Sequence, residues 1–307
     1  MTFIDTHCHL DLLMKSNAWR GKNFAEYRAA HPIPFPKGYK GCVAIWCQPS
    51  RFERAGAILK KQDDVWAAFG VHPHYQTEWT PEVANYIEER LTHLPQAVAW
   101  GEMGLDYNGH RGVESFCPRC TKFARRELTK EEKTKFCAPC QRRVFREQLQ
   151  RAVRLDKPLV IHSREAEADT LKIMKSFVPS NYPQIHRHCV TVGPDAVADF
   201  AQNFPRAKFG FTGVLWGSSK RARDARATVR ATPLHRILAE TDSPYFGPAE
   251  FNKLPGRWRM GNHPGSVARV VETIADLKGL TIKEVGDKLY LNAKEVYGLP
   301  LLNPAIC

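Results

Sequence analysis

The sequence alternates between short β-rich runs and amphipathic helical segments along its whole length, and this alternation restricts the fold more than any other feature. The segments between the runs have helical periodicity, as in Val144–Leu155 and Glu167–Phe177. Eight alternations within 307 residues favour an α/β fold, a (β/α)8 TIM barrel, over an open doubly wound sheet. No glycine-rich phosphate loop follows the first run, which further weakens a dinucleotide-binding fold. The eight expected strands are Phe3–His9, Cys42–Cys47, Trp66–Val71, Val98–Met103, Leu159–His162, Ile185–Val190, Lys208–Thr212 and Ile237–Thr241.

The interval between the fourth and fifth expected strands is much longer than the others. The excess lies between Tyr107 and Arg143, in the loop that would follow the fourth strand. In a barrel this loop opens at the C-terminal face, where active sites are built. We therefore expect one barrel domain over residues 1–307, with an insertion at residues 109–143.

Composition bears on the compartment and on the partners. The chain is 43% hydrophobic and 25% charged, which excludes disordered and fibrous classes. It has no apolar run of the roughly 18 residues that a membrane span needs, and Met1–His7 shows no secretory signal. We expect an intracellular monomer, cytoplasmic or nuclear, with no membrane partner.

The formal net charge of +13 makes nucleic acid a candidate partner, with plain solubility and an anionic small substrate as alternatives.

Polar residues fall at the C-terminal ends of the expected strands. Strand side chains alternate between faces, so the odd-numbered residues from Phe3 to His9 are expected to share one face. His7 and His9 would then project together at the end of the first strand, where two imidazoles can hold one divalent cation. A His-x-His pair on its own is also common among ordinary loop histidines.

Four further polar residues occupy the ends of other expected strands. Each of them could separately be a core polar group with satisfied hydrogen bonds. The C-terminal ends of parallel barrel strands meet at one rim, however, so these residues are expected to converge with His7 and His9. Imidazoles with shared carboxylates suit a two-metal centre of the kind that acts on phosphate esters. The four residues are Glu102, His162, His188 and Asp242.

Six stretches with this order and spacing resemble the TatD family of metal-dependent deoxyribonucleases, which are amidohydrolase-type barrels. Three more, Phe177–Pro179, Ile185–Cys189 and His263–Gly265, are most similar to the eukaryotic branch of TatD-domain-containing protein 2. The six stretches are Phe3–Asp11, Gly70–His74, Gly101–Tyr107, Pro158–Arg164, His188–Cys189 and Glu240–Tyr245.

The resemblance implies a ligand set for two divalent ions, Mg²⁺, Mn²⁺ or Zn²⁺. Glu102 would bridge the two ions. The first ion would also be held by His7, His9 and Asp242, and the second by His162 and His188.

The resemblance also implies roles in the reaction. Asp242 is expected to orient or deprotonate the attacking water, with Glu102 as the second catalytic carboxylate. His72 is expected to contact a phosphate or transfer a proton. Arg164 is a candidate phosphate clamp, and a salt bridge to Glu165 or to a neighbouring helix is the alternative.

The expected insertion contains two C-x-x-C motifs separated by 16 residues: Cys117, Cys120, Cys137 and Cys140. Nine cysteines in an intracellular chain are expected to be reduced. This spacing is typical of a structural Zn²⁺ with four thiolate ligands, and a redox pair is the main alternative. Residues 109–143 also carry ten Lys or Arg and four Glu, so the folded insertion is a candidate nucleic-acid contact beside the active site.

The favoured function is a divalent-metal-dependent nuclease that cuts phosphodiester bonds of DNA, with RNA as a further candidate. The sequence leaves exonuclease and endonuclease action both open. One alternative is an amidohydrolase acting on a small-molecule amide or ester, because barrels do not determine the substrate. A second is a non-catalytic nucleic-acid-binding module, for which eroded metal ligands would be expected.

Overall fold

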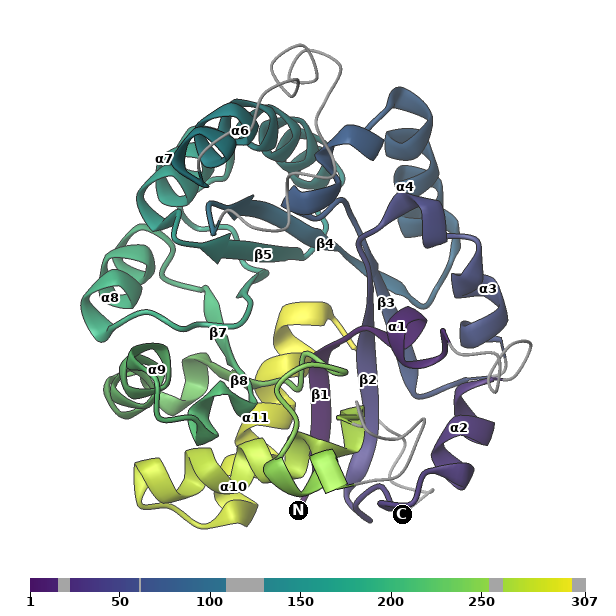
Figure 1. The fold of residues 1–307 in the computed structure, drawn as a ribbon, viewed down its shortest axis with the longest axis vertical. Helices are drawn as coiled ribbons and strands as arrows, with labels where there is room; N and C mark the ends of the chain where they lie inside the picture. The colour runs from purple at the N-terminus through teal and green to yellow at the C-terminus, as the bar shows by residue number, and fades with distance from the viewer. Residues whose placement is uncertain (16–22, 61, 109–129, 254–261, 300–307) are drawn as a thin grey trace.

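Eight parallel strands form the centre of the molecule and follow one another in sequence order, β1 to β8, in a single sheet (Figure 1). The computed structural model describes residues 1–15, 23–60, 62–108, 130–253 and 262–299, excepting the side chains of 130–137 and 252. The strands are β1 (Phe3–Cys8), β2 (Tyr39–Trp46), β3 (Val65–Phe69), β4 (Ala97–Asp106), β5 (Leu159–Arg164), β6 (Ile185–Arg187), β7 (Lys208–Phe211) and β8 (Ile237–Ala239).

Contacts between β1 and the end of β8 bring the two edges of the sheet together. The backbone N–H of His9 donates to the Ser243 carbonyl at 2.8 Å, and the N–H of Asp242 donates to the His7 carbonyl at 2.8 Å. The buried Asp5 carboxylate adds to this seam, because it accepts from the backbone N–H of Thr241 at 2.8 Å and from its hydroxyl at 2.5 Å. The expected (β/α)8 barrel is confirmed.

Helices surround the sheet, while α11 ends beneath the barrel interior (Figure 1). The α-helices are α1 (Leu10–Leu13), α2 (Phe24–Ala30), α3 (Arg54–Leu59), α4 (Pro81–His93), α6 (Lys130–Arg154), α7 (Glu167–Phe177), α8 (Pro194–Asn203), α9 (Lys220–Ala231), α10 (Val267–Lys278) and α11 (Ile282–Tyr297). Short 3-10 helices are η2 (Pro49–Arg51), η3 (Pro73–Glu78), η5 (Gly213–Trp216), η6 (Leu234–Arg236), η7 (Ala249–Lys253) and η9 (Pro264–Ser266).

The core has two layers, which follow from the alternation of side chains along each strand. An outer layer joins the strands to the helices, for example through Trp100 of β4 with Phe145 and Leu149 of α6. An inner layer fills the lower barrel with small and branched strand residues and includes Tyr297 from α11. This apolar floor leaves the polar residues at the upper, C-terminal end of the strands.

The first strand departs from simple alternation. Its register against β2 shifts between Phe3 and Asp5 and again between Asp5 and Cys8. Phe3 and Cys8 therefore both lie in the outer layer, although they have opposite parity. The prediction that all odd-numbered residues of this strand share one face is wrong at Phe3, because the irregular register turns the chain between the two ends.

The boundaries of other elements also differ from expectation. Strand β6 ends at Arg187 and β8 at Ala239, so His188 and Asp242 lie in the chain that follows the strands. Strand β4 runs on to Asp106, so Glu102 lies inside the strand and not at its end. The expected helix Glu167–Phe177 is confirmed as α7.

The expected insertion at residues 109–143 is only partly described. The backbone from Lys130 onward belongs to α6, so the C-terminal part of that segment is helix and not loop. Cys117 and Cys120 lie outside the described residues, whereas positions 137 and 140 fall within α6. The four-cysteine zinc site therefore stays a prediction.

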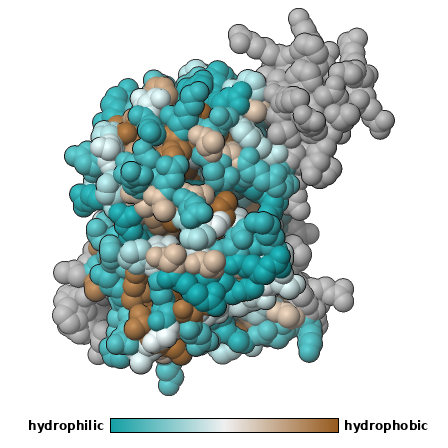
Figure 2. All heavy atoms as spheres, turned by 90° about the vertical axis from the view of Figure 1, so that its left-hand side faces the viewer, coloured by the Kyte–Doolittle hydropathy of each residue, from teal (hydrophilic) through white to brown (hydrophobic). Residues whose placement is uncertain are grey.

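The face of the molecule over α7, α8 and α9 is mostly hydrophilic, with apolar residues in scattered patches (Figure 2). None of the helices in the described ranges combines the length and the apolar character that crossing a bilayer requires.

Candidate metal centre

Glu102 lies at the centre of the polar cluster, and its two carboxylate oxygens face different histidines. Oε2 lies 3.4 Å from His7 Nε2 and 4.0 Å from His9 Nε2. Oε1 lies 2.5 Å from His162 Nδ1 and 3.6 Å from His188 Nε2. Only 3% of the Glu102 side chain is exposed, so its charge depends on these neighbours and not on water.

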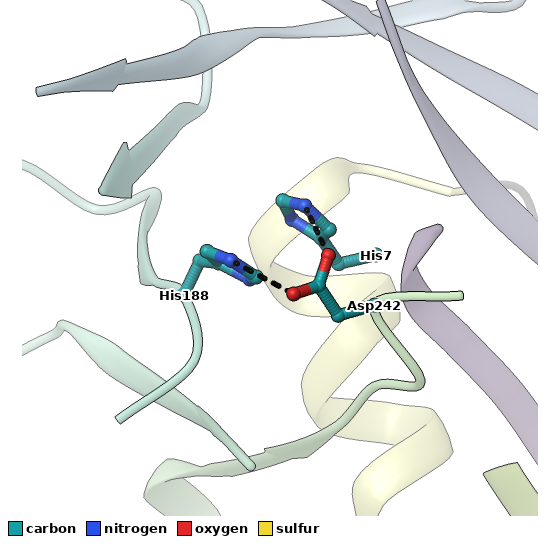
Figure 3. Close-up of side chains that lie close together, drawn as sticks. All are labelled: His7, His188 and Asp242. Atoms are coloured by element: carbon teal, nitrogen blue, oxygen red, sulfur yellow. Dashed lines mark ion pairs between the residues drawn. The ribbon is translucent and has the colours of Figure 1, made fainter. Parts of the chain in front are cut away.

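Asp242 completes the half of the cluster that contains His7 and His9. Its Oδ1 lies 3.1 Å from His9 Nε2 and 3.7 Å from His7 Nε2. Its Oδ2 lies 3.9 Å from His188 Nε2, and Figure 3 shows the carboxylate beside the imidazoles of His7 and His188, which stack on each other, with one oxygen toward each ring. The chain after β8 thus brings a second carboxylate to the histidines of β1.

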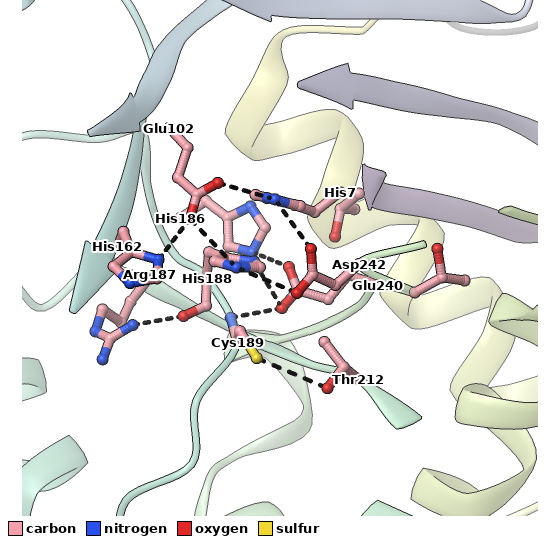
Figure 4. A network of polar contacts seen from close by, with 12 residues as sticks. His7, Glu102, His162, His186, Arg187, His188, Cys189, Thr212, Glu240 and Asp242 are labelled. Atoms are coloured by element: carbon pink, nitrogen blue, oxygen red, sulfur yellow. Dashed lines mark hydrogen bonds and ion pairs between the residues drawn. The ribbon is translucent and has the colours of Figure 1, made fainter. Parts of the chain in front are cut away.

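The predicted ligand residues therefore meet at one place, although they come from five segments of the chain. Figure 4 labels all of them except His9. Their separations suit a bound cation: two ligands of a tetrahedral zinc ion, each about 2.0–2.2 Å from it, lie roughly 3.4 Å apart. Most of the separations within the cluster are 3.1–4.0 Å. The exception is the 2.5 Å contact from His162 Nδ1 to Glu102, which is a hydrogen bond.

Unpaired buried nitrogens also fit a cation. Both ring nitrogens of His7 are buried and make no hydrogen bond within the described residues. A buried polar atom without a partner costs about 1–3 kcal/mol, and a cation facing Nε2 would remove that cost. The donor set of imidazoles and carboxylates accepts Zn²⁺, Mn²⁺ or Mg²⁺.

At two positions in the site, the pKa of the side chain favours the unprotonated form, which can bind a cation. Burial raises the pKa of Glu102, but the imidazoles of His188, His72 and His162 lower it more, so this pKa lies well below its usual value. Burial, helped by the nearby His188, lowers the pKa of His7 to about 4. At neutral pH an ionised carboxylate therefore faces a neutral imidazole.

Two carboxylates behind the histidines fix their orientation, and neither was predicted from the sequence. Asp106 Oδ2 lies 3.4 Å from His162 Nε2, and Glu240 Oε1 lies 3.2 Å from His188 Nδ1. A carboxylate behind one ring nitrogen favours a proton there and leaves the other nitrogen free for a cation. For His188 the other nitrogen is Nε2, which faces Glu102 at 3.6 Å, whereas His162 Nδ1 shares its hydrogen bond with Glu102.

Both carboxylates also hold a second histidine. Asp106 Oδ2 lies 3.0 Å from His74 Nε2. Glu240 Oε2 lies 2.9 Å from His186 Nε2, and His186 Nδ1 shares a hydrogen bond of 2.6 Å with the Tyr297 hydroxyl. The sequence contained a signal for both carboxylates. Asp106 and Glu240 each lie at the end of a strand, within a stretch that carries the family resemblance.

His72 and Arg164 lie at the edge of the cluster, on the Glu102 side. His72 Nδ1 accepts from the backbone N–H of His74 at 3.0 Å, which leaves the proton on Nε2, 3.7 Å from Glu102 Oε1. Arg164 is about 39% exposed, and its guanidinium lies 3.9 Å from Asp106 Oδ2. Glu165, its expected alternative partner, pairs with Arg221 instead.

Comparison with known proteins identifies a family for this chain. A family model described as TatD related DNase matches residues 4–298. The human protein named 3'-5' RNA nuclease TATDN2 is 39% identical over 298 residues, which are 97% of this chain and 35% of that protein. This chain therefore spans about a third of the length of that relative.

A bacterial relative matches over most of its own length. The Erwinia amylovora protein named 3'-5' ssDNA/RNA exonuclease TatD is 30% identical over 235 residues, 76% of this chain and 78% of that protein. The crystal structure of YJJV, a TatD homologue from Escherichia coli k12, has a TM-score of 0.73 at 24% identity over 97% of this chain and 98% of that one. At this identity the structural likeness supports the fold alone.

Proposed function

Because the chain belongs to the TatD-related DNase family, we propose that it is a divalent-metal-dependent nuclease that hydrolyses phosphodiester bonds of DNA or RNA. The human and bacterial relatives are named as 3'-5' nucleases of RNA and of single-stranded DNA and RNA. These names support action from the 3' end of a single strand. The observation that carries the proposal is the placement of Glu102, whose two oxygens face two separate pairs of imidazoles.

The proposed centre would hold two cations, and Glu102 would serve both because its two oxygens face the two groups of histidines. His7, His9 and Asp242 would hold the first cation, and His162 and His188 the second. When bound, divalent cations stabilise the charge that develops at phosphorus and lower the pKa of water.

The protein's own groups would position the substrate and move protons. Asp242 lies beside both halves of the cluster, where it can orient the attacking water and accept its proton. His72 would donate from Nε2 to a phosphate oxygen or to the leaving oxygen. The half-exposed guanidinium of Arg164 would bind a phosphate, because Asp106 holds it at the rim.

We further propose that the barrel domain, residues 1–307, carries a structural Zn²⁺ in an insertion at 109–143, held by Cys117, Cys120, Cys137 and Cys140. The paired C-x-x-C spacing supports this assignment. The excess of basic residues in the same segment supports a contact with the nucleic-acid backbone. Residence in the cytoplasm or nucleus and a monomeric state remain predictions.

The experiment that tests the nuclease is digestion of end-labelled single-stranded DNA and RNA with Mg²⁺, Mn²⁺ or Zn²⁺. Wild type should shorten the labelled strands, whereas Glu102→Gln and Asp242→Asn should reduce cleavage by about 10³-fold or more, since each removes a charge from both halves of the centre. Glu165→Gln, which removes an exposed carboxylate outside the cluster, is the matched control and should retain activity.

The outcomes separate the three functions. Full activity in both Glu102→Gln and Asp242→Asn would exclude the proposed mechanism. Metal-dependent cleavage of small amides or esters, with no cleavage of nucleic acid, would favour the amidohydrolase. Tight binding of nucleic acid without cleavage by wild type under any of the three ions would favour a binding module.

A further inference from the structure

Two exposed aromatic side chains stand in the loop directly after Asp242. Tyr245 is 39% exposed and Phe246 is 42% exposed. They are the only aromatic residues of the described part of the chain that belong to the exposed class. The other exposed large apolar residues in that part are not aromatic: Met1 precedes β1, Leu280 lies between α10 and α11, and Ile282 and Leu291 lie on α11.

Tyr245 lies against the metal cluster. Its ring centroid is 6.2 Å from that of His9, with the two rings nearly perpendicular at 78°. Its backbone N–H donates to the Asp242 carbonyl at 2.9 Å, which ties the backbone of Tyr245 to that of a predicted ligand. Phe246 continues the aromatic surface outward, with its ring centroid 6.4 Å from that of Tyr245.

The loop backbone holds these rings in place. Asn262 is buried and donates from Nδ2 to the carbonyls of Tyr245 and of Thr241. Phe246 has a φ of +52°, which is uncommon for a bulky residue. The Phe246 carbonyl approaches Gly213 so closely that a Cβ on Gly213 would lie 2.1 Å from it. The exposure of the two rings is thus built into the fold.

We propose that Tyr245 and Phe246 form a platform on which a nucleobase of the substrate stacks, next to the phosphate that is cut. This inference rests on the proposed nuclease function and deepens it. Stacking on exposed aromatic rings suits any base, because every base has a π-face, and it needs a base that is not stacked within a duplex. The platform therefore selects single-stranded nucleic acid without selecting a sequence.

Neighbouring aromatic residues favour a nucleic-acid strand as the occupant. The partly exposed Tyr75 ring lies 6.1 Å from His72, beside the other half of the cluster. Aromatic rings thus stand beside both halves of the cluster, Tyr245 beside His9 and Tyr75 beside His72. This placement is expected where a nucleic-acid strand crosses the site.

The test combines changes in the enzyme with changes in the substrate. Wild type and the double variant Tyr245→Leu, Phe246→Leu act on end-labelled oligothymidylate and on an oligomer of equal length made of abasic deoxyribose phosphates. Leucine keeps apolar bulk but removes the ring. The double variant should lose about 5-fold or more of kcat/KM on oligothymidylate, the lower end of base stacking on an aromatic ring, and nothing on the abasic oligomer.

One control variant accompanies the test. Leu291→Ala removes an exposed aliphatic side chain of α11 and should retain wild-type kcat/KM on both oligomers.

The possible results are distinct. An equal loss on both oligomers, or no loss on either, would overturn the platform while the nuclease assignment stands. Cleavage of neither oligomer by wild type would overturn the nuclease and the platform together. Equal cleavage of oligothymidylate and of the same strand in a duplex would contradict the selection of single strands.

Discussion

Asp106 shows how one carboxylate outside the ligand set can control the candidate site. Its Oδ2 lies near His74, His162 and Arg164, at 3.0, 3.4 and 3.9 Å. Burial raises its pKa, but hydrogen bonds from His162 and His74 lower it more, so it lies well below its usual value. The backbone of Asp106 is itself fixed by Gln141, whose amide accepts from its N–H at 2.9 Å and donates to its carbonyl at 3.0 Å.

We expect Asp106→Asn to weaken metal binding without unfolding the protein. The substitution keeps the shape of the side chain but removes the charge that orients His162, and losing such a partner typically costs 10–100-fold in metal affinity or activity. The measurement is cleavage rate against Mn²⁺ concentration, which separates metal affinity from maximal rate.

Asp169→Asn provides the matched control for this substitution. Asp169 lies on α7 and accepts hydrogen bonds from Tyr107 and Arg142, outside the cluster. Because a partly exposed ion pair contributes little, this substitution should change the Mn²⁺ concentration for half-maximal cleavage by less than about 3-fold. An unchanged Mn²⁺ requirement in Asp106→Asn would show that His162 is oriented by other groups.

At the scale of elements, the close approach of β4 and β5 positions ligands from two strands. Gly104 of β4 pairs with His162 of β5, and a Cβ on Gly104 would lie 1.8 Å from the His162 carbonyl oxygen. Its φ of +150° also disfavours a side chain. Glycine at this position therefore allows β5 to bring His162 to Glu102.

Gly104→Ala should lower the free energy of unfolding by about 1–3 kcal/mol or more, because backbone must move to relieve the overlap. Gly56→Ala, in α3, is the control: its Cβ would meet no atom within 4 Å. That change should raise the free energy of unfolding by about 0.5–1 kcal/mol, as alanine favours the helix. Denaturant unfolding followed by circular dichroism measures both, and equal stability of Gly104→Ala and wild type would contradict the packing argument.

At the scale of the whole molecule, the cluster joins segments that are far apart in the sequence. His9 and Asp242 are 233 residues apart, and His162 and Glu102 are 60 residues apart. These residues meet only when the barrel is closed, so a cation held by them binds the folded state and not the unfolded chain.

We therefore expect divalent cations to stabilise the fold. A free Mn²⁺ concentration of 100 times Kd should add about 2.7 kcal/mol to the free energy of unfolding, which corresponds to a rise in Tm of about 4 °C for a chain of this length. Differential scanning calorimetry of chelator-treated protein, with and without added Mn²⁺, measures the rise. Glu102→Gln should lose most of it and Glu165→Gln should keep it, whereas the same rise in all three proteins would place the stabilising cation elsewhere.

The fold and the chemistry of the site could be predicted from the sequence because both leave local signals. Helical and strand periodicity recur eight times, and the helix Glu167–Phe177 appears where its amphipathic pattern predicts it. Histidines and carboxylates that interrupt apolar strands, such as Glu102 and His162, are costly to bury without partners. Residue type and position were therefore enough to indicate a polar cluster at the strand ends.

Tertiary structure alone decided how that cluster is arranged. Three features depend on distances between separate segments and leave no local signal. They are the shifted register of β1, the different histidines that the two oxygens of Glu102 face, and the placement of Asp106 and Glu240 behind histidines. Periodicity reports only which face of a strand a residue occupies. The geometry is determined when β8 meets β1 and the barrel closes, because that step sets which side chains stand within a few ångströms of one another.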